Sequence, residues 1–291
     1  MERPLNDVRH EEGIFWAADG LCLFEQFWHP TTAPRGVVVM IHGHGDHSGR
    51  YASLGEFLAQ EGYAAEAMDL RGHGRSQGPR AFVWSFDEYV NDVERFLERV
   101  RRRYPGAPLF LLGHSMGGTV VTLLALNRRS SGGGRSQDPA GLILCSAAVR
   151  VSDHVSPLLV RLAPLLGRLL PRMSSLRLDS AAISRDPAVV EAARVDPLMY
   201  HGGMKARTGA ELHRAITRIQ LDMERLTLPL LIMHGTDDAI VEVTGSEEIY
   251  QRAGSKDKML LLYRGFYHEL FTDPEAERVH DDLLGWLDAR A

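Results

Sequence analysis

The sequence predicts an α/β fold with a mostly parallel central sheet, helices on both faces and a helical cap. Two observations carry this prediction. Short apolar runs without polar alternation, as expected for strands buried on both faces, alternate with helical segments along the chain. A serine between two glycines, Gly113 and Gly117, also stands between one of these runs and a helical segment, which indicates a sharp strand-to-helix turn.

The elements are expected in the following order. A hairpin comes first, because Asp19-Gly20 separates the apolar stretches 14–16 and 21–24. Continuous apolar runs then predict buried strands, and apolar residues at helical spacing predict helices, two of which end at Gly62 and at Pro105-Gly106. The expected strands are 36–41, 63–70, 108–112, 142–145, 228–233 and 259–263, and the expected helices are 51–60, 86–103, 116–127 and 275–289.

Residues 151–225 interrupt this alternation. They insert leucine-rich helical sequence, broken by Pro157, Pro164 and Pro171, where the next strand is due. A pair of ordinary core helices is the alternative, but an insertion between two core strands favours a cap over the strand ends, where α/β sheets bind ligands. We therefore expect a core formed by 1–150 and 226–291 and a cap or lid formed by 151–225.

Composition is that of a globular protein, with 291 residues, 44% of them apolar and 24% charged. The net charge of -5 gives no electrostatic reason to expect a nucleic-acid partner. Cys22 and Cys145 lie in apolar strand-like runs and predict no disulfide framework. The polar start has no apolar signal-peptide region, and no apolar run is long enough to span a bilayer. We expect a cytoplasmic protein with at most peripheral membrane contact.

The segment around Ser115 carries the chemistry. A Gly-x-Ser-x-Gly pattern alone is weak evidence, but here a buried strand precedes it and a helix follows it, which is the setting of the nucleophile elbow of α/β-hydrolases. The turn lifts the hydroxyl clear of the sheet and places it near a helix N-terminus, where negative charge is favoured. Ser115 is therefore predicted to be the nucleophile of a hydrolase that needs no metal or other cofactor.

A serine nucleophile needs a base and an acid that orients the base. In this fold the three follow in the order serine, acid, histidine, each after a strand. Asp237 and Asp238 follow the strand 228–233, and His268 follows the strand 259–263. Taken alone, either aspartate would be interpreted as a turn residue and His268 as a structural histidine. Order and strand-end placement together predict a triad, although the pattern does not choose between the two aspartates.

The oxyanion formed on attack requires two fixed donors. One is expected to be the backbone N–H of Met116, the residue after the nucleophile. The other is expected from the glycine-rich turn 42–45, which follows the strand 36–41.

That same turn allows a rival interpretation. The residues His42, His44, Asp46 and His47 match the His-x-His-x-Asp-His pattern of zinc hydrolases, in which a metal-bound hydroxide is the attacking group. This alternative leaves the Ser115 turn, the aspartate turn and the cap unexplained. It also predicts two packed sheets in place of alternating strands and helices, so we expect no metal site here.

The chain resembles the monoacylglycerol lipase and lysophospholipase branch of the α/β-hydrolases over roughly residues 11–288. The resemblance rests on His42–Tyr51, Asp69–Ser76, Gly113–Gly118, Asp196–Leu198 and Tyr267–Glu269. It implies that Asp238 is the acid, because the family places it three residues after the glycine matching Gly235. It also implies that the His44 N–H is the second oxyanion donor, and that Asp46 and Arg50 lie near the glycerol end of the site. The substrate implied is a monoacylglycerol or a similar monoacyl ester.

Two positions depart from the family pattern. The family more often has Glu where this chain has Asp46, and the cap tyrosine of glycerol-specific members aligns with Ala193. Both differences leave open a broader carboxylesterase, a lysophospholipase or a thioesterase that uses the same triad. A catalytically silent binding protein on a hydrolase fold is a further alternative, disfavoured by the complete triad. The apolar cap predicts an acyl-binding tunnel and transient contact with membranes or micelles.

Overall fold

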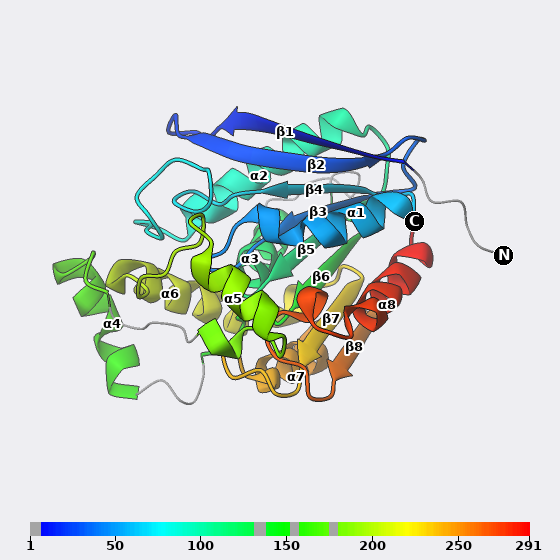
Figure 1. Cartoon of the computed structure of the whole chain (residues 1–291). Helices are drawn as coiled ribbons and strands as arrows, with labels where there is room; N and C mark the ends of the chain where they lie inside the picture. Colours follow the sequence, from blue (N-terminus) through cyan, green and yellow to red (C-terminus); the bar gives the residue numbers. More distant parts are fainter. Residues whose placement is uncertain (1–6, 131–137, 152–156, 175–179) are drawn as a thin grey trace.

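The computed structural model describes residues 7–130, 138–151, 157–174 and 180–291, and its centre is one eight-stranded sheet (Figure 1). The order of the strands across the sheet is β1-β2-β4-β3-β5-β6-β7-β8. The strands are β1 (Val8–Trp16), β2 (Cys22–Pro30), β3 (Val37–Ile41), β4 (Ala64–Met68), β5 (Leu109–His114), β6 (Gly141–Cys145), β7 (Leu230–Gly235) and β8 (Lys258–Tyr263).

The predicted fold class is confirmed. β1 and β2 form the expected antiparallel hairpin, and β2 joins β4 antiparallel, whereas every pairing from β4 through β3 to β8 is parallel. All residues of β3, β4, β5, β6 and β7 are buried, as expected for strands covered on both faces, and this includes Glu66 in the middle of β4. The carboxyl ends of the parallel strands therefore meet at one edge of the sheet.

Helices cover both faces of this sheet. The described helices of the core are α1 (Ala52–Gln60), α2 (Asp87–Arg103), α3 (Met116–Ser130), α7 (Val243–Arg252) and α8 (Ala276–Asp288). Alternate strand residues enter two separate apolar clusters, one with α2 and α3 and the other with α1 and α8. Figure 1 shows α1 and α8 on one side of the sheet and α2 and α3 behind it. The helix α7 was not expected from the sequence.

The insertion between β6 and β7 is helical, as predicted. It contains α4 (Pro157–Leu169), the 3₁₀ turn Ser180–Ala182, α5 (Pro187–Val195) and α6 (Ala206–Asp222), while 152–156 and 175–179 lie outside the described residues. In Figure 1 α4 and α6 lie at one end of the molecule, and α5 lies nearer the middle of the view. Several residues along α6, including Ala210 and Ile219, are buried, whereas most residues of α4 from Arg161 to Leu169 are exposed.

The structure also bears on the expectations about membrane-spanning segments and cysteines. Among the described residues, no helix combines the length and apolar character needed to cross a membrane. Cys22 and Cys145 carry free thiols, but only Cys145 is fully buried, because Cys22 stands at the start of β2 with part of its surface exposed. The polar start at 1–6 lies outside the described residues.

Candidate active site

Ser115 occupies a strained turn between β5 and α3. Its φ is +53°, in the left-handed region that residues other than glycine rarely adopt. A Cβ on Gly117 would lie 2.2 Å from the Ile41 carbonyl oxygen, and one on Gly113 would lie 2.5 Å from the Gly117 oxygen. Both glycines of the motif are therefore required by close backbone packing around the serine.

His268 and Asp238 form a hydrogen-bonded pair on the loops that follow β8 and β7. The His268 Nδ1 lies 2.7 Å from Asp238 Oδ2. A carboxylate only accepts hydrogen bonds, so Nδ1 carries the proton and Nε2 is left as the basic nitrogen. Both side chains are almost completely buried. The pair thus has the tautomer that a general base requires.

The Asp238 carboxylate is held by four donors. Its Oδ2 also accepts from His234 Nε2 at 3.1 Å, and its Oδ1 accepts from the backbone N–H groups of Ile240 and Val241 at 2.8 and 3.0 Å. Burial acts to raise the pKa of Asp238, but the charge of His268 and these hydrogen bonds outweigh burial and hold the pKa below its ordinary value. The carboxylate therefore stays ionised.

His234 was not singled out by the sequence. Its Nε2 lies between Asp238 Oδ2 and the Val241 carbonyl oxygen, both acceptors, so this nitrogen is protonated. Its Nδ1 therefore accepts from the Ser246 hydroxyl of α7 at 2.7 Å. His234 thus gives the Asp238 oxygen that binds His268 a second donor.

The sequence pattern left Asp237 and Asp238 open, and the geometry separates them. Asp237 is exposed and accepts a hydrogen bond from the Thr236 hydroxyl at 2.8 Å, as a turn residue does. Asp238, which the family resemblance implied, is the aspartate that contacts the histidine.

The predicted oxyanion loop lies directly against the nucleophile. A Cβ on Gly43 would be 3.0 Å from the Ser115 Cβ and 3.5 Å from its Oγ, so only glycine leaves room for substrate here. His44 follows Gly43 in the wall of the same cavity, and Met116 begins α3 beside Ser115. The backbone N–H of Tyr200, from the cap, donates to the Gly45 carbonyl oxygen at 2.8 Å and ties this loop to the insertion.

One cavity of about 340 Å³ brings these elements together. Ser115, His268 and the predicted oxyanion loop line it, together with residues of the insertion, among them Ala193, the position where the family tyrosine is absent. The further lining residues are Asp46, His114, Ile183, Arg194, Met199, Tyr200, His201, Gly202, Met204, Ile240 and Glu269.

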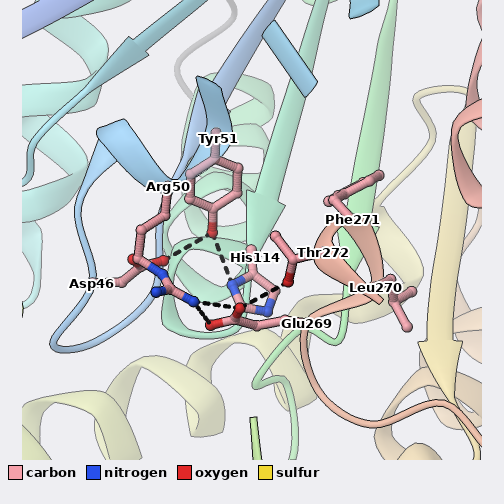
Figure 2. A pocket seen from close by; sticks show the side chains of 8 residues that line it. All are labelled: Asp46, Arg50, Tyr51, His114, Glu269, Leu270, Phe271 and Thr272. Carbon is pink, nitrogen blue, oxygen red and sulfur yellow. Dashed lines mark hydrogen bonds and ion pairs between the residues drawn. The ribbon is translucent and has the colours of Figure 1, made fainter. Parts of the chain in front are cut away.

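Asp46, His114 and Glu269 in the lining of this cavity belong to a network of polar side chains, which Figure 2 shows around a smaller neighbouring cavity. Asp46 accepts from the Tyr51 hydroxyl at 3.1 Å, and its other oxygen is 3.3 Å from Arg50 Nε. Arg50 Nη2 contacts both oxygens of Glu269, at 2.6 and 2.5 Å. Burial raises the pKa of Glu269 despite this ion pair. His114 completes the network through its Nδ1, 2.9 Å from the Tyr51 hydroxyl.

The two residues predicted to bind substrate differ in position. Asp46 lines the main cavity, but Arg50 lines a smaller neighbouring cavity of about 20 Å³ and lies behind Asp46 and Glu269. Burial opposes the charge of Arg50, but the adjacent carboxylates raise its pKa. Arg50 is thus placed to fix the two carboxylates in position.

Three of the four side chains in the zinc alternative, those of His42, Asp46 and His47, have other hydrogen-bond partners in the structure. His42 uses both ring nitrogens, donating from Nδ1 to the Gly43 carbonyl oxygen and accepting at Nε2 from the Leu70 N–H. His47 Nε2 is 2.9 Å from Asp196, and Asp46 is held by the network described above. In the part of the chain that the structure describes, no three His, Cys, Asp or Glu side chains converge as metal ligands.

Comparison with known proteins agrees with this geometry. The profile of the family described as "Serine aminopeptidase, S33" matches residues 32–275. The chain is 37% identical over 276 residues to the monoacylglycerol lipase of Mycolicibacterium smegmatis, covering 95% of this chain and 96% of that one. It is 34% identical to the human monoglyceride lipase, covering 99% and 92%.

Solved structures with a similar fold include a monoglyceride lipase as well. A soluble variant of the Saccharomyces cerevisiae monoglyceride lipase, solved in complex with a substrate analog, superposes with a TM-score of 0.82 at 27% identity, covering 100% of this chain and 96% of that one. The chain therefore belongs to the serine aminopeptidase S33 family of α/β-hydrolases and is a carboxylic ester hydrolase related to the monoacylglycerol lipases.

Proposed function

We propose that this chain hydrolyses monoacylglycerols, or monoacyl esters of similar shape, to a free fatty acid and an alcohol through an acyl-enzyme intermediate. The observation that carries the proposal is that Ser115, on its strained turn, shares one cavity with His268, whose Nδ1 is bound to the buried Asp238. Monoacylglycerol and monoglyceride lipases among the relatives support the substrate class.

The reaction follows from the tautomer of the base. His268 Nε2 takes the hydroxyl proton as Ser115 Oγ attacks the ester carbonyl, and Asp238 stabilises the imidazolium that forms. The N–H groups of His44 and Met116 are the proposed donors to the oxyanion. The imidazolium then gives its proton to the leaving alkoxide, so that the alcohol departs. Water attacks the acyl-enzyme while His268 takes its proton, and collapse of this intermediate releases the fatty acid and restores Ser115.

The cavity walls support an assignment of its two ends. The apolar side chains Ile183, Met199 and Met204 suit an acyl chain, whereas the polar end with Asp46 and Glu269 suits a neutral polyol such as glycerol. We propose that Asp46 accepts hydrogen bonds from the glycerol hydroxyls and that Arg50 holds Asp46 for this role. Two carboxylates at this end disfavour the phosphate of a lysophospholipid through like-charge repulsion.

A broader carboxylesterase or thioesterase is the second candidate. The small Ala193 side chain supports it, because the cavity wall there lacks the bulk of the tyrosine that the glycerol-specific pattern carries. A less filled wall accommodates aryl and branched leaving groups, which the test below includes.

We also propose that 151–225 acts as a lid whose outer face touches lipid. Large apolar side chains are exposed on α4 and just after it, with Arg161 and Arg168 beside them. These apolar residues are Leu162, Leu165, Leu169, Leu170 and Met173. Replacing Leu165 and Leu169 by Glu should reduce flotation with vesicles and leave turnover of a soluble ester intact. Leu221→Glu, at an exposed leucine of α6, is the matched control.

The decisive assay is hydrolysis of 1-monoacylglycerols of increasing acyl length beside p-nitrophenyl esters, with Ser115→Ala as the blank. Strong turnover of the glycerides, lost in the blank, is the expected result. Turnover of the aryl esters alone would assign the chain to the broader esterases. Glyceride turnover that persists in Ser115→Ala would overturn the proposed nucleophile.

A further inference from the structure

The segment Cys145–Ala148, which starts at the last residue of β6, contacts the backbone of both Ser115 and His268, the proposed reacting residues. The Ser115 N–H donates to the Cys145 carbonyl oxygen at 3.0 Å, and the Ala148 N–H donates to the Ser115 carbonyl oxygen at 3.0 Å. Between these two contacts, the Ser146 hydroxyl donates to the main-chain carbonyl oxygen of His268 at 2.8 Å. One short segment thus holds the nucleophile and the base together.

Ser146 has an unfavourable backbone conformation. Ala81, Ser115 and Ser146 are the non-glycine residues with positive φ in the described ranges, and Ser146 has a φ of +44°. Such a conformation persists only where the surrounding structure imposes it. A main-chain hydrogen bond holds Ser146 in this conformation, because its N–H donates to the Met233 carbonyl oxygen of β7 at 2.8 Å. The strained turn therefore fixes where the hydroxyl of this fully buried residue points.

The His114 ring lies beside the same carbonyl. His114 Nε2 is 3.3 Å from the His268 carbonyl oxygen, and the two rings lie 4.7 Å apart. Burial, together with the nearby His268, lowers the pKa of His114 to about 3, so its ring is neutral and does not repel the base when the base is protonated. Because the Tyr51 hydroxyl donates to Asp46, His114 donates from Nδ1 to the Tyr51 oxygen, and its neutral ring has no proton at Nε2 for this carbonyl. Ser146 is therefore the side-chain donor that holds the His268 backbone.

We propose that Ser146 is a positioning residue, whose hydroxyl holds the His268 backbone so that the imidazole stays aligned between Asp238 and Ser115. The carboxylate restrains only one end of the ring, at Nδ1, and leaves the ring free to swing about that contact if the backbone shifts. A group displaced by about 1 Å costs about 100-fold in rate. The inference rests on the proposed triad but not on the identity of the ester.

The test compares two replacements of Ser146 that lack the hydroxyl. Ser146→Ala keeps the strain at positive φ, whereas Ser146→Gly relieves it. Both variants should lower kcat for a p-nitrophenyl ester about 10- to 100-fold with KM within about twofold. Both should slow the labelling of Ser115 by a fluorophosphonate to a similar extent, because labelling needs the aligned base.

Ser255→Ala is the matched control. Ser255 is also buried, and its hydroxyl also donates to a main-chain carbonyl oxygen, that of Asp257 at 2.8 Å, in the turn before β8. It should lose a comparable amount of thermal stability while keeping the wild-type kcat and labelling rate.

Three results would overturn the proposal. These are a kcat within twofold of wild type in both Ser146 variants, a kcat loss in Ser255→Ala of the same size, or wild-type activity in Ser146→Gly alone. The last result would assign the effect to backbone strain. Failure of the proposed triad is recognised separately, because the wild-type protein would then show no Ser115-dependent labelling.

Discussion

Replacing Asp238 by Asn should abolish nearly all turnover, because of how donors are arranged around the carboxylate. One oxygen faces the His268 and His234 nitrogens, and the other faces the Ile240 and Val241 N–H groups. An amide has a single oxygen. Since a backbone N–H cannot stop being a donor, the amide oxygen must face Ile240 and Val241, and the amide NH₂ must face the two imidazoles.

His268 would then accept at Nδ1 and carry its proton on Nε2, where it cannot deprotonate the serine. A base fixed in the wrong tautomer costs about 10³- to 10⁴-fold in kcat, or about 4 to 5.5 kcal/mol of transition-state stabilisation. The measurement is kcat/KM on a soluble ester across pH, beside Asp237→Asn. That control changes the exposed neighbour and should stay within about twofold of wild type. A loss below tenfold in Asp238→Asn would refute the assigned donor pattern.

Three further predictions concern folding. Arg50→Met should destabilise by about 3 to 5 kcal/mol in denaturant titrations, because it leaves the Glu269 carboxylate buried without its partner, and Glu269→Gln in the same chain should recover most of this loss. If the double variant is as unstable as the single one, the ion-pair argument fails. Burial raises the pKa of Glu66 to about 7, so the folded state keeps a proton that the unfolded chain releases above about 4.3. Stability should therefore fall by up to about 3 kcal/mol as pH rises from about 4.5 to 7, and an unchanged slope in Glu66→Gln would contradict this. Gly117→Ala should cost at least about 3 kcal/mol, because its Cβ would meet the Ile41 carbonyl oxygen at 2.2 Å, and a soluble variant with wild-type unfolding would exclude that contact.

Much of the sheet was predictable because β3, β5, β6 and β7 are buried on both faces and consist mainly of continuous apolar residues. The helix α7 was not, since Val243–Arg252 is mostly polar and Gly245, Ser246 and Ile249 are its fully buried residues. Its apolar periodicity is too sparse to separate a helix from a loop.

The candidate site was predictable where chain order sets position, as for Ser115 and His268. It was not predictable where contacts join distant segments. Arg50 and Glu269 are 219 residues apart, and nothing in the sequence around either residue indicates that the two form an ion pair. His234 gave a weak signal, a histidine at the end of a buried strand, but its role depends on the hydroxyl that α7 supplies.

The link between the cap and the oxyanion loop has a consequence for recombining this chain with its relatives. The stretch Asp196–Tyr200 binds the segment that contains this loop twice, through the Tyr200 N–H to Gly45 in the loop and through Asp196 to His47 just after it. A chimera that exchanges this stretch without the loop breaks both contacts at once. A crossover placed before Asp196 replaces α4 and α5 as a module and keeps the loop with its native partner. Such a chimera should change the part of the cavity wall that α5 supplies while it leaves the proposed oxyanion donors, His44 and Met116, in their native surroundings.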